Sequence, residues 1–271
     1  MTSHHVLHWF DFICPFCYIA QDRNRILRDA AVSVIDLPMQ IHPEVAPGGA
    51  PAPPRTGPMY DHLVDEARAA GLELNWSPRV PYSRFALAAA QAVRINEPEH
   101  HPAFNAAVFD AYFARGQDIE DWTVIAECAE AVGVEPFAFR YSMTSGIADN
   151  ELRFAEEQAR RHHVFATPSW VVNNDQLIAG LRPRAFFIAL SHELNRADHP
   201  DDPGPDRYPV ARGTGDPPGV LPGTKVHQGW NASAASPEET RGEVVLRSAR
   251  LQHPLTPRAT GTGGRPWEQS P

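Results

Sequence analysis

The order of apolar and polar positions predicts an alternating opening to this chain. Residues 6–13 are short, apolar and rich in aromatic side chains, as in a buried strand. Residues 15–30 carry apolar side chains at helical spacing, and residues 33–42 alternate apolar and polar positions as a second strand does. A strand, a helix and a strand in this order favour a parallel pair joined by a right-handed crossover.

The rest of the patterned chain is mostly helical. Residues 43–58 form a loop rich in proline, glycine and alanine. Helices are expected after it, several of them ending at glycine, over residues 59–70, 82–95, 103–115, 121–131, 136–143 and 149–163. Strand patterns return at 169–172 and 176–179, and the Asn-Asn-Asp turn between them tolerates left-handed backbone, which predicts an antiparallel hairpin. A closing helix follows at 183–195, with one apolar face made of Phe186, Phe187, Leu190 and Leu194.

Composition changes at about residue 197. The 75 residues 197–271 hold 12 of the 27 prolines and 10 of the 18 glycines, with few large apolar side chains. Such a segment cannot bury enough surface to offset the entropy of ordering it. We therefore predict a folded unit over residues 5–196 and a disordered Pro/Gly-rich tail over 197–271.

Charge and the N-terminal pattern restrict the partners. The net charge is −9 and no dense basic cluster occurs, so no nucleic-acid partner is expected. The apolar stretch near the N-terminus is interrupted by His8 and Asp11, is too short to span a membrane, and lacks a basic region before it or a cleavage site after it. We expect a cytoplasmic protein that does not bind a membrane.

Two of the three cysteines form the most reactive motif in the chain. Cys14 and Cys17 enclose Pro15 and Phe16, at the junction of the first predicted strand and helix. The unpaired N–H groups and positive dipole end of a helix favour a thiolate at the first sulfur. Because a thiolate attacks disulfides and a thiol does not, Cys14 is the predicted nucleophile and Cys17 its resolving partner. Pro15 suits the first helical position, where an N–H is not needed.

Metal binding is the main alternative for a CxxC pair, and the rest of the sequence argues against it. A structural zinc usually has four ligands, and no second CxxC or paired Cys/His motif follows. Adjacent histidines on a helix point about 100° apart and chelate poorly. Cys128, within a predicted helix, is typical of a small buried core residue. We expect no metal and no cofactor.

Thr167 and Pro168, just before the predicted hairpin, complete a recognisable arrangement. A strand, a CxxC at a helix start and a Thr-Pro before a hairpin resemble the thioredoxin constellation. The resemblance implies a cis peptide at Pro168 beside the cysteine sulfurs, with the Thr167 backbone exposed for an extended substrate. Pro15, Phe16, Thr167 and Pro168 are thus the expected substrate-binding residues.

The long interval between Cys17 and Pro168 narrows the resemblance. It spans 151 residues, and the excess over a bare thioredoxin is helical. The chain therefore resembles the DsbA-like branch, in which a helical domain is inserted into the thioredoxin fold. Residues 10–18, 42–43, 81–84 and 166–169 are similar to FrnE-type and polyketide-associated members. The expected fold is α/β and thioredoxin-like, with the thioredoxin part at 5–45 and 164–196 and the helical insertion at about 59–163.

The family resemblance implies a thiol–disulfide oxidoreductase. Cys14 would form a mixed disulfide that Cys17 resolves. The substrate would be a disulfide-containing protein or a small thiol, and glutathione or thioredoxin would recycle the enzyme. Strongly oxidising, exported DsbA proteins often have histidine where this chain has Phe16. Without that stabiliser of the thiolate, and without an export signal, reduction or isomerisation is favoured over oxidation.

Two alternatives use the same fold. The 2-hydroxychromene-2-carboxylate isomerases and kappa-class glutathione transferases share the long helical insertion, but generally carry serine near the position of Cys14. A non-enzymatic, chaperone-like binding module would use an apolar groove of the helical region.

The residues alone also leave the roles of two side chains open. Asp11 either assists proton transfer from Cys17 or is a solvent-facing or capping residue, and Trp170 lines a substrate groove with Phe16 or packs in the core.

Overall fold

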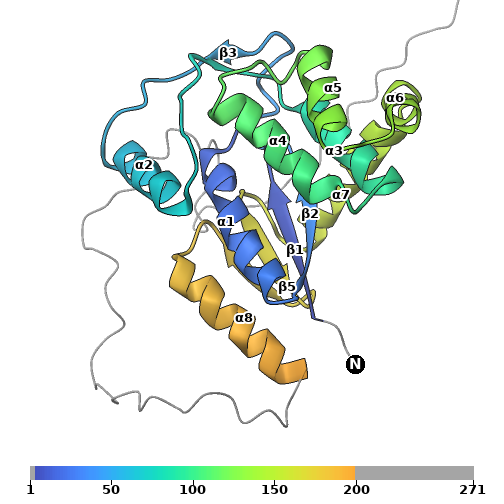
Figure 1. Cartoon of the computed structure of the whole chain (residues 1–271). Coiled ribbons are helices and arrows are strands. Elements are labelled where there is room, and N and C mark those ends of the chain that lie inside the picture. Colours follow the sequence, from blue (N-terminus) through green and yellow to red (C-terminus); the bar gives the residue numbers. More distant parts are fainter. Residues whose placement is uncertain (1–3, 199–271) are drawn as a thin grey trace, which may run out of the picture. The chain divides into compact units, whose positions relative to one another are not determined.

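A four-stranded mixed sheet lies at the centre of the computed structural model, which describes residues 4–198 (Figure 1). The strands lie in the order β2-β1-β5-β6. Their bounds are β1 (His5–Phe10), β2 (Ser33–Pro38), β5 (Ser169–Val172) and β6 (Gln176–Ala179). The β1–β2 pair is parallel, and β5 runs antiparallel to both β1 and β6. The parallel pair and the hairpin predicted from the sequence are therefore confirmed.

Helices cover both faces of the sheet because the strand side chains alternate between two apolar clusters. Val6 and Trp170 face α1 (Pro15–Asp29) and α8 (Arg184–Asp198), where Leu27 and Phe187 join the same cluster. Trp9 and Val171 point to the opposite face and pack against Ala155 and Ala159 of α7 (Ile147–Arg161). Residues 170 and 171 thus contribute to two cores within one short strand.

The remaining helices lie between β2 and α7 along the chain. They are α2 (Pro58–Ala70), α3 (Arg84–Asn96), α4 (His101–Phe113), α5 (Trp122–Ala131) and α6 (Pro136–Thr144). A two-residue pair that the sequence did not predict, β3 (Ala50–Pro51) with β4 (Arg79–Val80), ties the loop after β2 to the segment before α3. No helix in the described part of the chain is long and apolar enough to cross a membrane.

Most differences from the sequence prediction lie at element ends. The second strand stops at Pro38 instead of residue 42, because the chain turns there and the N–H of Ile41 bonds to the side chain of Asp11. Phe186 is 39% exposed and does not share the buried face of Phe187, since neighbouring helical residues point about 100° apart. Asn173 and Asn174 adopt the expected left-handed backbone.

The predicted tail of residues 197–271 lies outside the described residues, apart from positions 197 and 198 at the end of α8. The boundaries expected for the thioredoxin part and the helical insertion stay predictions.

Candidate active site

The two cysteines lie at the N-terminal end of α1. Cys14 is the residue before the helix, with extended backbone, and Pro15 occupies the first helical position. The carbonyl oxygen of Cys14 accepts the N–H groups of Cys17 at 3.0 Å and Tyr18 at 3.1 Å, which closes the first turn. Cys14 is 4% exposed, Cys17 is fully buried, and both are free thiols. Both thiols are therefore buried, Cys14 slightly less than Cys17.

The Thr167–Pro168 segment meets Cys14 across more than half of the chain. The peptide bond between Thr167 and Pro168 is cis, as the resemblance implied. In its thiol form, Cys14 Sγ donates to the carbonyl oxygen of Thr167 at 3.4 Å. Pro168 is buried and Thr167 is half-buried. The fold thus brings the Cys14–Cys17 segment and the Thr167–Pro168 segment together, with the Cys14 sulfur against the Thr167 carbonyl.

The environment separates the two thiols electrostatically. Burial raises the pKa of Cys14, but hydrogen bonding from Cys17 outweighs it and holds that pKa below its ordinary value. Burial raises the pKa of Cys17 well above its ordinary value, and the neighbouring Cys14 raises it further. Cys14 therefore favours the thiolate and Cys17 favours the thiol.

Asp11, three residues before Cys14, is a fully buried carboxyl. It accepts hydrogen bonds from the N–H groups of Ile13 at 3.3 Å and Ile41 at 2.9 Å, and from the hydroxyl of Ser83 at 3.2 Å. Burial raises the pKa of Asp11 to about 6, against the opposite effect of these bonds. The charge of Asp11 in turn raises the pKa of Cys14. Asp11 is therefore a buried acid of the site and not a solvent-facing residue.

The aromatic residues near the site divide between the core and the surface. Phe16 is half-buried, and its ring packs against Ile19 of α1 and Leu63 of α2. Trp170 is fully buried in the core, stacked on His8, so it does not line a substrate groove. Phe165 is 79% exposed, two residues before Thr167. The sequence alone did not single out Phe165, although this large aromatic residue lies only two positions before Thr167.

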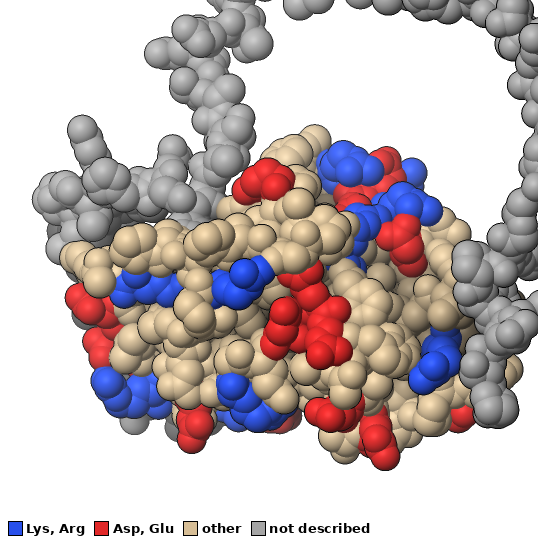
Figure 2. Space-filling view, turned by 90° about the horizontal axis from the view of Figure 1, so that it is seen from above, with Lys and Arg blue, Asp and Glu red and all other residues tan. Residues whose placement is uncertain are grey.

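The other candidate side chains lie apart from the dithiol chemistry. Cys128 is buried on α5, as expected for a core residue, and burial raises its pKa to about 11. Within residues 4–198, no three His, Cys, Asp or Glu side chains are grouped so that they could hold a metal ion. On the face drawn in Figure 2, positive and negative side chains are interspersed among uncharged ones.

Comparisons with known proteins agree with this arrangement. The model of the DSBA-like thioredoxin domain matches residues 5–189. The uncharacterized protein YwbO of Bacillus subtilis is 23% identical over 202 residues, which cover 71% of this chain and 98% of YwbO.

Two solved structures have a similar fold. A probable DsbA oxidoreductase from Streptomyces coelicolor is 19% identical with a TM-score of 0.62, covering 76% of this chain and 93% of its own. A 2-hydroxychromene-2-carboxylate isomerase is 18% identical with a TM-score of 0.58, covering 72% of this chain and 97% of its own. With the family match over residues 5–189, they confirm the fold predicted from the sequence: the chain belongs to the DSBA-like thioredoxin family.

Proposed function

We propose that this protein is a thiol–disulfide oxidoreductase in which Cys14 is the nucleophile and Cys17 the resolving thiol. The opposite pKa shifts of the two sulfurs carry the proposal, because exchange needs one thiolate that attacks and one thiol that resolves the mixed disulfide. Membership of the DSBA-like family supports the same chemistry.

The reaction proceeds through a mixed disulfide. The Cys14 thiolate attacks one sulfur of a substrate disulfide, forms a bond to it and releases the other sulfur as a thiolate that takes up a proton. Cys17 then loses its proton and attacks Cys14 Sγ, which forms the Cys14–Cys17 disulfide and releases the second substrate thiol. Two electrons pass from the dithiol to the substrate, and the reverse sequence oxidises a substrate dithiol.

Substrate binding uses the segments on either side of the reactive sulfur. We propose that Thr167 and Pro168 hold an extended substrate beside Cys14, and that Pro15 and Phe16 contact the substrate from the helix side. The substrate is a disulfide-containing protein or small thiol, and glutathione or thioredoxin returns the enzyme to the dithiol. The cytoplasmic location expected from the sequence stays a prediction.

Single cysteine variants test the assignment. Cys14→Ser abolishes exchange with a fluorescent disulfide-linked peptide, whereas Cys17→Ser accumulates a mixed disulfide that mass spectrometry detects on Cys14. Cys128→Ser, a buried cysteine on another helix, is the matched control and keeps full activity. Full exchange activity in Cys14→Ser would contradict the proposal.

The direction of electron flow follows from the reduction potential of the Cys14–Cys17 pair. A value near that of thioredoxin, about −270 mV, identifies a reductase, and a value near that of DsbA, about −120 mV, identifies an oxidase. Equilibration with glutathione buffers of known ratio, read by thiol alkylation and mass spectrometry, gives this value.

Further measurements separate the alternatives. A glutathione-dependent isomerase or transferase predicts that glutathione stabilises the protein against heat and that a small aromatic substrate is converted. A chaperone-like module predicts that suppression of aggregation survives the loss of both Cys14 and Cys17. Either result, together with no disulfide exchange, would replace the oxidoreductase proposal.

A further inference from the structure

A polar pocket lies apart from the dithiol, between the C-terminal half of α1, the start of α4 and the strands β1 and β2. Its volume is about 270 Å³, and its lining contains neither Cys14 nor Cys17. This is the space of about nine water molecules, so it fits a small metabolite better than a single ion. More than half of its lining residues are polar or charged.

The inner end of the pocket holds a buried His–Asp pair. His8 Nδ1 lies 2.7 Å from Asp36 Oδ1, and the two residues are 2% and 5% exposed. Burial raises the pKa of Asp36, but the bond from His8 and the charge of Arg28 outweigh it and hold that pKa well below its usual range. Asp36 Oδ1 and the side-chain amide nitrogen of Asn24, at 2.7 and 2.8 Å, both contact Nδ1 of His8, so Nε2 is left for another partner.

Two buried polar atoms of the pocket residues have no hydrogen-bond partner within the described part of the chain. They are Nε2 of His8 and Oδ1 of Asn105, a residue of α4 that is 6% exposed. Buried polar groups are almost always paired, since an unpaired one is costly. The Nδ2 of Asn105 faces His101 Nε2 at 3.2 Å, so its amide oxygen remains to accept a donor. A hydroxyl group suits either atom, because it can donate to the amide oxygen or to an unprotonated imidazole nitrogen, so two hydroxyl groups of one ligand would satisfy both.

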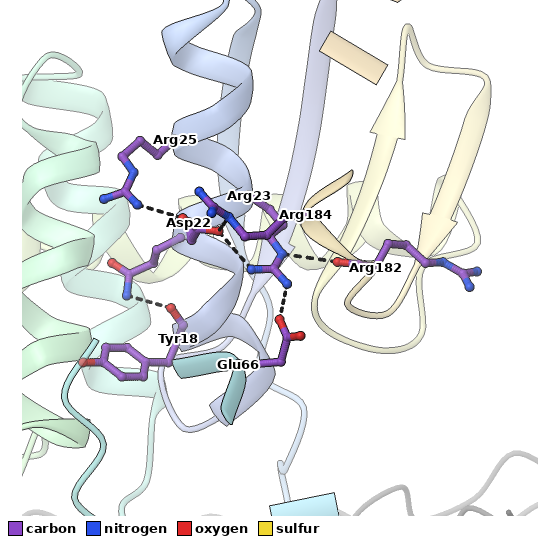
Figure 3. Close-up of polar contacts among 8 residues, drawn as sticks. Tyr18, Asp22, Arg23, Arg25, Glu66, Arg182 and Arg184 are labelled. Atoms are coloured by element: carbon purple, nitrogen blue, oxygen red, sulfur yellow. Dashed lines mark hydrogen bonds and ion pairs between the residues drawn. The ribbon is translucent and has the colours of Figure 1, made fainter. Parts of the chain in front are cut away.

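Two arginines of α1 also line the pocket. Arg25 is 59% exposed and pairs with Asp22 at 2.7 Å, and Arg28 pairs with Asp36. Figure 3 shows Arg25 reaching Asp22, which Arg184 also contacts, so Asp22 does not depend on Arg25 alone. A guanidinium has five N–H donors in a planar fork that matches a carboxylate, so each arginine keeps donors for a bound anion.

We propose that this pocket binds a small polyhydroxylated carboxylic acid, of the sugar-acid class. Its hydroxyl groups bond to His8 and Asn105 inside, and its carboxylate bonds to Arg25 and Arg28. This binding goes beyond disulfide exchange and does not depend on either cysteine.

Calorimetry with the full chain carrying Cys14→Ser and Cys17→Ser tests the proposal without any dithiol chemistry. The probes are gluconate, hexanoate, which lacks the hydroxyl groups, and sorbitol, which lacks the carboxylate. We expect gluconate to bind saturably, and both other probes to bind about tenfold or more weakly. Glucose 6-phosphate distinguishes a carboxylate site from a phosphate site, because tighter binding of this sugar phosphate would overturn the sugar-acid assignment.

Variants then locate the site. Arg25→Gln and Asn105→Leu are each expected to weaken gluconate binding about tenfold. Arg160→Gln on α7, which removes an arginine of similar exposure, leaves binding unchanged. A gluconate dissociation constant weaker than about 10 mM overturns the proposal, as does equal binding by all probes or by Arg25→Gln. Because Arg25 is exposed, its substitution keeps the fold and the test stays valid if Asn105→Leu does not fold.

Discussion

Replacing Asp11 by asparagine should change how the stability of the protein depends on pH. The side chain keeps its size and its place between Ile13, Ile41 and Ser83, but it can no longer ionise. One acceptor oxygen becomes an NH₂ group, so one of these hydrogen bonds is lost at every pH, at a cost of about 1–3 kcal/mol. The part of the effect that varies with pH reports the buried carboxylate alone.

The magnitude follows from the raised pKa of Asp11. A carboxyl with a pKa of 3.8 in the unfolded chain and about 6 in the folded protein binds its proton more tightly when folded. Folded stability is therefore greatest below the unfolded value, and it falls as the pH rises toward 6 and levels off above it. The full loss is about 3 kcal/mol, of which roughly 1.4 kcal/mol falls between about pH 5 and pH 8.

Urea unfolding of the wild type and of Asp11→Asn at about pH 5 and pH 8 measures this change. The stability of the wild type relative to the variant should fall by about 1.4 kcal/mol between the two pH values. Asp175→Asn, at the exposed turn of the hairpin, controls for the removal of one carboxylate elsewhere. A wild-type minus Asp11→Asn difference that stays constant over this range would refute the reasoning, because Asp11 would then ionise without cost in the folded protein.

The same variant changes the reactive thiol. The charge of Asp11 raises the pKa of Cys14, so its removal should lower that pKa. The rate of iodoacetamide alkylation as a function of pH, measured with Cys17 and Cys128 replaced by serine, gives the pKa of Cys14 directly. An unchanged alkylation profile would mean that Asp11 does not act on the sulfur.

Three further substitutions test the packing around the site, each by urea unfolding at neutral pH. Arg23→Met removes a fully buried partner of the buried Asp22 and should cost about 3 kcal/mol, at the low end for a broken buried pair because other arginines still reach Asp22. Trp170→Phe leaves the buried amide oxygen that the indole N–H bonds at 2.7 Å without its donor, and should cost about 2 kcal/mol. Gly49→Ala places a Cβ 2.6 Å from a backbone carbonyl oxygen and should cost more than Gly71→Ala, where φ is also positive but space is open and about 1 kcal/mol is expected. Equal losses at the two glycines, or losses below about 0.5 kcal/mol for Arg23→Met or Trp170→Phe, would contradict these assignments.

Local signals in the sequence were sufficient to predict the helices and strands around the dithiol. The prolines and glycines that bound the helices, and the asparagines of the hairpin turn, act through backbone conformation, which neighbouring residues determine. The position of Cys14 before α1 follows from the same kind of signal, since Pro15 suits a helix start. Errors arose where contacts distant in the chain decide the outcome, as at the end of β2, where Ile41 bonds to Asp11.

The sequence by itself determined the order of the main elements, the pair of cysteines at a helix start and the Thr-Pro segment before the hairpin. Only the tertiary structure decided what each polar side chain near the sheet does. His8 and Asp11 both interrupt the same apolar stretch, yet the charge of Asp11 acts on Cys14 and His8 binds Asp36 at a separate pocket. The physical reason is that a pKa and a hydrogen-bond partner depend on burial and on groups that are distant in the chain. Those distances exist only once the fold has formed.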